Sequence, residues 1–304
     1  MTIGKHDSAV GQRLREIFAD AGCAAWLHAR TIGRSPEREF DWYADDPVVM
    51  ASVYKLPLFA ALCVRADNGD IDLREKVTVD PREQAAGPTG IAALHDPITL
   101  SWRDLAVQMM VVSDNAAADV ILAEVGLDYV HKVLDEAGLH ATHVVGGMAH
   151  VQKQLLSDTG TSSVAEAFTA LANIDWRGSI SAYDPALAGA TTARDATSLL
   201  DLIWTDRVAS RHSCDFIRTT MRKQAWKQRI SSGFPLGIAT VAGKTGTLGA
   251  IRNEVAVVEY PGEYPVAVAV FTHAARSELS LPTVEAAIGQ AARVAVNEVR
   301  SALS

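Results

Sequence analysis

Two β-branched, apolar runs near the C-terminal end constrain the fold of this 304-residue chain most strongly. They are Val255 to Tyr260 and Val266 to Thr272, separated by a short segment that contains two prolines and a glycine. This pattern is typical of a β-hairpin, and Ile238 to Ala242 predicts the strand before it. Pro282 to Leu303 predicts a long helix. We therefore expect an antiparallel sheet with a terminal helix packed on it.

The N-terminal part predicts elements of the same kind: a helix over Ala9 to Cys23 and short strands over Ala24 to Ala29 and Phe40 to Tyr43. The middle of the chain is mostly helical in pattern. Its predicted helices are Ser52 to Ala66, a capped helix from Ser101 to Val111 or Val112, Ala116 to Glu124, Leu127 to Ala137, Val164 to Asn173, Thr192 to Asp206 and His212 to Met221. Predicted loops or extended pieces are Ile71 to Asp80, Gln84 to Pro97, Ala141 to Thr161 and Asp175 to Thr191.

This order of elements predicts an α+β fold. The terminal segments share one antiparallel sheet of about five strands, and an all-helical subdomain is inserted between them. We expect a single domain over residues 1–304, with an α/β part at about 1–50 and 207–304 and a helical subdomain at about 51–206.

The sequence Ser52-Val53-Tyr54-Lys55 places a hydroxyl and an amine three residues apart at the start of the apolar helix. Residues i and i+3 share a helix face. A lysine in an apolar wall can lose its proton and act as a base on the serine. Alone, the pair more often means a helix cap and a surface lysine.

Two further motifs follow in chain order. Ser113-Asp114-Asn115 favours a capping turn, in which Asp114 is expected to bond backbone. Lys244-Thr245-Gly246-Thr247 follows a β-branched run and is expected on an edge strand. Alternation along that strand places Lys244 and Gly246 on one face and the two threonines on the other.

Serine-x-x-lysine, then S-D-N, then K-T-G resembles the signature of class A β-lactamases and penicillin-binding proteins, over nearly the whole chain from about Ser8. The resemblance implies a β-lactamase/D,D-peptidase fold and an acyl-enzyme on Ser52. It implies that Lys55 is the base, that Ser113 passes a proton to the leaving group and that Lys244 steers the substrate. The substrate-binding positions that it implies are Asn115, Thr245, Gly246 and Thr247, the last through its amide.

Arg252 lies eight residues after Lys244, on the next predicted strand. The resemblance makes it a candidate partner for a substrate carboxylate. A surface salt bridge with Glu254 or Glu259 is an equally good interpretation, and Arg276 is a weaker candidate for the same role.

One family element is missing. Efficient class A β-lactamases carry Glu-x-x-Leu-Asn on the loop after S-D-N, and its glutamate activates the water that clears the acyl-enzyme. Residues 146–152 read GGMAHVQ here, without a carboxylate. The alternatives for a base are Lys55 itself, Ser113, His150 or an acid of the rebuilt loop. Asp158 is the first acid after this loop, and the later Glu166 and Asp184 are more typical of surface or capping residues. Losing a positioned base costs about a hundredfold or more in rate, so slow deacylation is expected.

Composition excludes several function classes. There are 28 Lys and Arg against 36 Asp and Glu, a net charge of -8, which disfavours nucleic acid and anionic membranes as partners. The spacing of the 3 cysteines indicates no disulfide framework or zinc site, and no cofactor is expected. The first residues have no apolar core of signal-peptide length and no stretch approaches a transmembrane span, which predicts a cytoplasmic protein.

The leading functional prediction is a β-lactamase-like serine hydrolase with weak or no β-lactam turnover, acting on a small-molecule amide, ester or β-lactam. Two alternatives stay open. One is a D,D-peptidase, esterase or acyltransferase of the same fold. The other is a non-catalytic sensor that binds β-lactams, although a pure binder has no need of Lys55 or Ser113.

Overall fold

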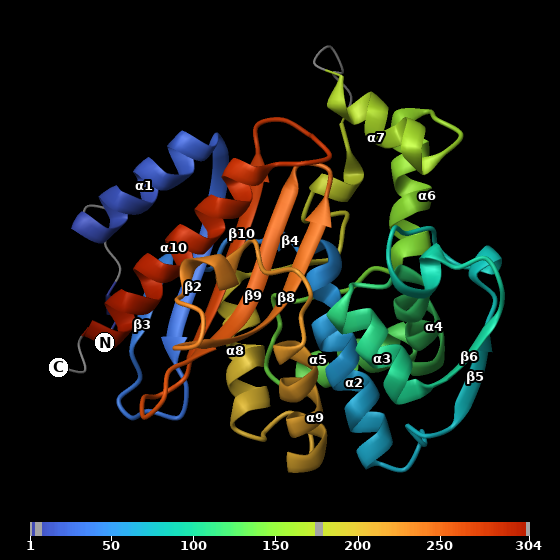
Figure 1. The fold of residues 1–304 in the computed structure, drawn as a ribbon, viewed down its shortest axis with the longest axis horizontal. Coiled ribbons are helices and arrows are strands. Elements are labelled where there is room, and N and C mark those ends of the chain that lie inside the picture. Colours follow the sequence, from blue (N-terminus) through green and yellow to red (C-terminus); the bar gives the residue numbers. More distant parts are fainter. Residues whose placement is uncertain (1, 4–7, 174–178, 302–304) are drawn as a thin grey trace.

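The computed structural model describes residues 2–3, 8–173 and 179–301 and confirms the α+β class (Figure 1). Within these ranges one sheet has six strands in the order β1-β3-β2-β10-β9-β8. The strands are β1 (Thr2–Ile3), β2 (Cys23–Thr31), β3 (Glu39–Trp42), β8 (Thr240–Leu248), β9 (Ile251–Glu259) and β10 (Val266–Ala274). All neighbours are antiparallel except β1 and β3, which pair in parallel. The predicted hairpin is therefore confirmed, and β8 is an edge strand.

Alternating side chains of the sheet enter two different cores. Val266, Val268 and Val270 of β10 pack with α1 (Ala9–Ala21) and α10 (Pro282–Ser301) on one face. Ala267, Ala269 and Phe271 pack into the larger core on the other face. This two-sided burial explains why the strands are apolar throughout rather than alternating with polar residues. Residues 302 and 303 of the predicted terminal helix lie outside the described ranges.

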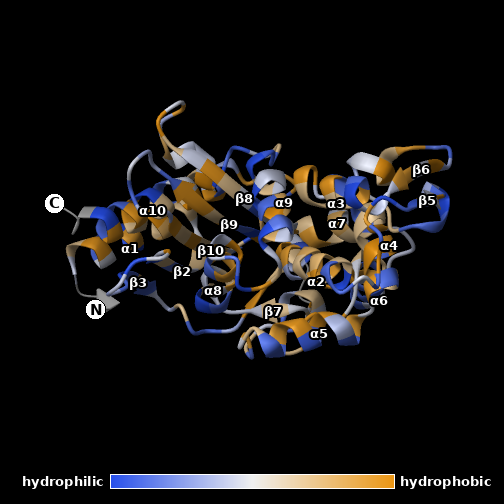
Figure 2. Cartoon of the chain, turned by 90° about the horizontal axis from the view of Figure 1, so that it is seen from below, coloured by the Kyte–Doolittle hydropathy of each residue, from blue (hydrophilic) through white to orange (hydrophobic). Residues whose placement is uncertain are grey.

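The larger core is built by helices between β3 and β8. They are α2 (Lys55–Asp67), α3 (Trp102–Val111), α4 (Asn115–Val125), α5 (Leu127–Glu136), α8 (Ala193–Trp204) and α9 (Arg211–Arg222). The buried residues of α6 (Met148–Thr159) and α7 (Val164–Ala172) form a separate core with Leu248 and Ile251. Two strand pairs accompany them: β4 (Val48–Val49) with β7 (Ala190–Thr191), and β5 (Lys76–Val79) with β6 (Ile98–Ser101). Hydrophobic residues gather around α2 and along the sheet beside α10 (Figure 2).

Local signals identified most helix starts correctly. Ser101 Oγ accepts a hydrogen bond from Asp104 N at 3.3 Å, which confirms the predicted cap of α3. Helix α2 packs against α4, α5 and α9 and is buried from Lys55 to Cys63. Cys63 is a free thiol in this core, as expected.

The prediction of a loop over Ala141 to Thr161 was wrong, because α6 occupies Met148–Thr159. The helix begins on a tertiary contact. Asp119 of α4 accepts hydrogen bonds from Met148 N at 2.6 Å and Ala149 N at 2.8 Å, so a side chain distant in sequence satisfies the first amides of the helix. The loop predicted over Asp175 to Thr191 is described only from residue 179 onward.

Within the described ranges, no helix combines the length and the apolar character needed to cross a membrane. The predicted cytoplasmic location stays a prediction.

Candidate active site

A cavity of about 530 Å³ lies between β8 and the helices, and it collects most of the predicted site residues. We call it the main cavity. The predicted residues that line it are Ser52, Ser113, Asn115, Thr245, Thr247 and Arg252. Lys55 and Lys244 are fully buried next to it.

Ser52 lies in a 3-10 turn (Ala51–Tyr54) that runs directly into α2. The residue before it, Ala51, has a φ of 46°, a left-handed conformation that costs a non-glycine residue about 1 kcal/mol or more. Strain of this kind is typical of functional turns. Among the described residues, no side chain forms a hydrogen bond with the Ser52 hydroxyl. Ser52 lines the main cavity.

Lys55 contacts the S-D-N turn rather than solvent. Its Nζ donates to the backbone oxygen of Ser113 at 2.7 Å and to Asn115 Oδ1 at 2.9 Å, and it lies 3.4 Å from Ser113 Oγ. Burial lowers the pKa of Lys55 to about 7, although Asp114 and Asp119 act in the opposite direction. A neutral amine has two N–H groups, which these acceptors satisfy, and one lone pair, which stays available to take a proton.

Ser113 connects the two lysines. Lys244 Nζ donates to Ser113 Oγ at 2.9 Å and to the backbone oxygen of Thr245 at 2.7 Å. Burial, with the nearby Lys55 and Arg229 charges, holds the pKa of Lys244 well below its usual range. Ser113 itself has a φ of 61°, so it too is held in a strained backbone conformation. A hydroxyl shared by two buried amines is well placed to relay a proton.

Asp114 has the structural role that the sequence predicts. Its carboxylate accepts from Ala116 N at 3.0 Å at the start of α4 and from Ile91 N at 2.6 Å in the neighbouring loop. This capping turn holds Ser113 and Asn115 on either side of Asp114. Asn115 also donates to the backbone oxygen of Ala86 at 3.0 Å, which closes one rim of the main cavity.

Gly246 brings β8 against the turn that carries Ser52. A Cβ on Gly246 would lie 2.6 Å from the backbone oxygen of Met50 and 3.1 Å from a methyl of Val53. Its missing side chain therefore makes room for the protein backbone at Met50. Lys244 faces the helical side as well, as the strand alternation predicts, and Thr247 is exposed to the cavity.

Arg252 is buried, and its guanidinium is held by backbone. It donates to the backbone oxygens of Ile251 at 2.9 Å and Glu278 at 2.9 Å. The alternative of a surface salt bridge with Glu254 or Glu259 is wrong, because Glu254 accepts from a backbone amide and Glu259 pairs with another arginine. Arg276, the weaker candidate, is exposed and does not line the main cavity.

Arg229 lies beside β8 at the main cavity and was not predicted from the sequence. Its Nη2 donates to Thr247 Oγ1 at 2.7 Å and to Glu285 Oε1 at 3.0 Å, and its Nη1 donates to the backbone oxygen of Gly246 at 2.8 Å. Its Nε is buried and has no hydrogen-bond partner among the residues that the structure describes. Arg229 comes from a loop without a local motif, so nothing in the sequence indicates its place.

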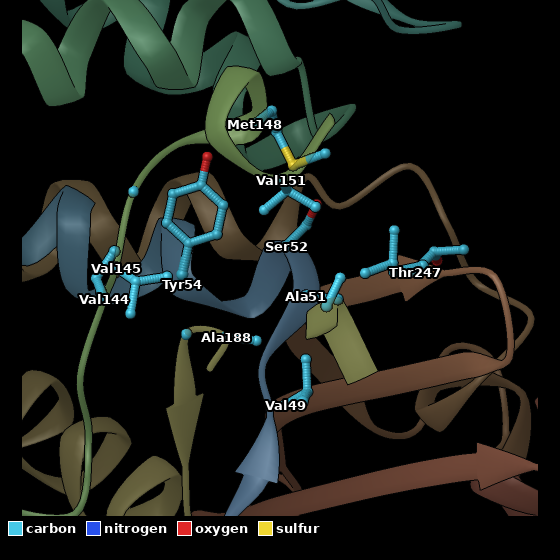
Figure 3. A pocket seen from close by; sticks show the side chains of 14 residues that line it. Val49, Ala51, Ser52, Tyr54, Val144, Val145, Met148, Val151, Ala188 and Thr247 are labelled. Carbon is cyan, nitrogen blue, oxygen red and sulfur yellow. The ribbon is translucent and has the colours of Figure 1, made fainter. Parts of the chain in front are cut away.

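A second, smaller cavity of about 30 Å³ lies next to Ser52, and we call it the inner cavity (Figure 3). Its volume is enough for a water molecule. Met148 and Val151 of α6 lie over Ser52, and Tyr54 lies beside it (Figure 3). None of the residues that line this cavity is an acid or a histidine.

The alternative bases proposed from sequence lie elsewhere. Asp158 accepts from Ser181 Oγ at 2.7 Å, Glu166 accepts from Ser162 Oγ at 2.8 Å and Asp184 accepts from a backbone amide. His150 is exposed on α6. None of these four residues lines either cavity.

Two further polar residues near Ser52 were not predicted. Asp119 caps α6, and burial raises the pKa of its carboxyl. The hydroxyl of Tyr54 is buried, and burial raises the pKa of Tyr54 well above its usual value. In the described part of the chain, no group of three or more His, Cys, Asp and Glu side chains is arranged to hold a metal ion.

In this structure the edge strand of the sheet faces a helical block. A serine, two buried lysines and a capping S-D-N turn lie between them, and this arrangement is that of the penicillin-recognising serine proteins. Residues 9–299 match the family described as the Beta-lactamase enzyme family, and the chain belongs to this family.

Comparison with individual proteins agrees with this placement. The chain is 28% identical over 297 residues to "Beta-lactamase regulatory protein BlaB" of Streptomyces cacaoi, covering 93% of this chain and 95% of that protein. Among solved structures, a β-lactamase of Sphaerobacter thermophilus has a TM-score of 0.75 at 23% identity, covering 95% of this chain and 96% of that one. PBP-A has a TM-score of 0.77 at 18% identity, covering 99% and 98%. These likenesses confirm the β-lactamase and penicillin-binding fold.

Proposed function

We propose that this protein is a serine hydrolase that forms an acyl-enzyme on Ser52 and clears it slowly. The observation that carries the proposal is the position of the Ser113 hydroxyl. It accepts a hydrogen bond from Lys244, lies 3.4 Å from Lys55 Nζ and lines the same cavity as Ser52. A serine alone is a weak nucleophile and needs a neighbouring base. The low pKa of Lys55 supplies that base near neutral pH.

In the proposed acylation, Ser52 Oγ attacks the carbonyl carbon of an amide, ester or β-lactam, and its proton passes to Lys55. The bond from the carbonyl carbon to the leaving nitrogen or oxygen then breaks. Ser113 gives its proton to that leaving atom and is reprotonated from Lys55 or Lys244. The amides of Ser52 and Thr247 are proposed to stabilise the oxyanion.

We propose that the β8 side of the main cavity binds a substrate carboxylate. Thr245, Thr247 and Arg229 converge there, and the hydroxyl of Thr247 already accepts a hydrogen bond from Arg229. Arginine with a hydroxyl partner is well suited to carboxylate oxygens. Arg252 supports the β8 side of the cavity, because it holds the loop that contains Glu278. Asn115 is proposed to bind an amide in the acyl part of the substrate.

Deacylation is proposed to be slow because no acid or histidine lines the inner cavity next to Ser52. The residues with a hydroxyl group that line this cavity are Ser52, Tyr54 and Thr247, and a hydroxyl is not a strong base at neutral pH. The two carboxylates that line the main cavity, Glu278 and Glu285, lie on the side of Arg252 and Arg229.

Stopped-flow kinetics with a chromogenic cephalosporin tests this proposal. We expect a burst of about one product per enzyme, because acylation precedes a slow hydrolysis, followed by a steady rate at least about a hundredfold lower. The Ser52→Ala variant is expected to give neither phase. Steady turnover without a burst, or an unchanged burst in Ser52→Ala, would contradict the proposal.

A second function, a β-lactam sensor, is favoured by the similarity to BlaB, which is named as a regulatory protein. A long-lived adduct suits a sensor, because the modified state persists after the ligand is gone. The two functions differ in the fate of the acylated protein: a sensor keeps its adduct for hours, whereas an enzyme releases product and returns to the free state.

A further inference from the structure

One wall of the main cavity is apolar and comes from two helices. Its side chains are Met148, Val151 and Leu155 of α6, and Val164 and Phe168 of α7. We call this set the α6–α7 wall. Met148, Val151 and Leu155 follow helical spacing on one face of α6, and Val164 and Phe168 are one turn apart on α7. The wall carries no charged group.

The lining of the main cavity therefore combines two kinds of surface. Arg229 and Thr247 are polar and lie beside β8, and the α6–α7 wall is apolar. On the same helix as the wall, Gln152 Nε2 donates to the backbone oxygen of Ala86 at 2.7 Å, which ties α6 to the loop that carries Ala86. A volume of about 530 Å³ is within the range of pockets that bury a drug-sized ligand.

The position of Ser113 decides which part of a substrate meets this wall. Ser113 lines the main cavity but not the inner one, whereas Ser52, Met148 and Val151 line both. The leaving group must lie near Ser113 to receive its proton. The acyl group, which stays on Ser52, then extends over Met148 and Val151 toward α7.

Resting on the proposed function, we propose that the natural substrates are esters or amides with an apolar acyl group of about six to eight carbons, which the α6–α7 wall binds. A fully buried methylene contributes roughly fourfold in binding, and a wall that covers one side of the chain contributes less than that. We therefore expect kcat/KM to be about tenfold or more higher for a substrate with an eight-carbon acyl chain than for one with a two-carbon acyl chain.

The experiment measures kcat/KM, or the acylation rate constant, for p-nitrophenyl acetate, butanoate, hexanoate and octanoate. The wild type is expected to rise along the series. Phe168→Gln is expected to lose most of the rise, measured as the ratio of the octanoate rate to the acetate rate. Val164→Thr, nearly the same in shape, is expected to lose about threefold on octanoate alone. Ala165→Gln, on the exposed face of α7, is the matched control and is expected to behave as wild type.

The outcomes separate this inference from the function on which it rests. A flat series in the wild type, or a rise that Phe168→Gln and Val164→Thr both retain, overturns the inference while ester hydrolysis still depends on Ser52. Ester hydrolysis that Ser52→Ala leaves unchanged overturns the proposed function and this inference together. Circular dichroism of each variant shows whether it is folded.

Discussion

Replacing Lys55 by methionine is expected to lower the acylation rate constant by about a thousandfold, within the range for loss of a general base. The side chain is buried, lies against Ser113 and Asn115 and has a pKa of about 7. Methionine keeps the length and apolar stem of the side chain but cannot take the proton of Ser52. The measurement is the second-order rate constant for acylation by a β-lactam, followed by stopped flow or mass spectrometry.

The pH dependence of the same rate constant gives an independent check. Only neutral Lys55 can act as a base, so acylation by the wild type is expected to rise about tenfold per pH unit below pH 7 and to level off above it. Lys55→Met is expected to lose this rise. Lys153→Met, which changes an exposed lysine of α6, is the matched control. A Lys55→Met rate within a few-fold of wild type would exclude Lys55 as the base.

Replacing Val151 by glutamate is expected to shorten the life of the acyl-enzyme by about a hundredfold, because it supplies the missing base. Val151 lies over Ser52 at the inner cavity, where a water molecule fits (Figure 3). The carboxylate can then activate that water toward the ester carbonyl. Deacylation is measured by mass spectrometry after excess β-lactam is removed.

Val151→Gln is the control for this change, because it has the same shape without the charge. Its adduct is expected to last about as long as that of the wild type. Equal deacylation by the glutamate and glutamine variants would contradict the interpretation that a missing base at this place makes turnover slow.

Local patterns in the sequence predicted the parts of the fold that depend on local interactions. The hairpin of β9 and β10 follows from two β-branched runs, and the cap of α3 follows from Ser101 and Asp104. The start of α6 depends instead on Asp119, which belongs to another helix. No pattern within Ala141 to Thr161 records that contact, so the prediction of a loop failed there.

The residues of the candidate site also divide into those that local sequence motifs predicted and those that only tertiary contacts bring together. Ser52, Lys55, Ser113 and Lys244 lie in three short motifs whose spacing could be recognised, and the structure brings these motifs together around one cavity. Arg229 reaches Thr247 from a loop with no motif. The turn that follows it, η5 (Ile230–Gly233), packs against α10, and this tertiary contact positions the loop. The α6–α7 wall depends on a helix that the sequence did not predict.

The central claim is that Ser52 can be acylated, and the intact mass of the protein after incubation with penicillin G tests it most directly. We predict one adduct of the mass of the intact penicillin, located on the peptide that contains Ser52 and absent in Ser52→Ala. The absence of any adduct on the folded wild-type protein, or an equal adduct on Ser52→Ala, would contradict the account.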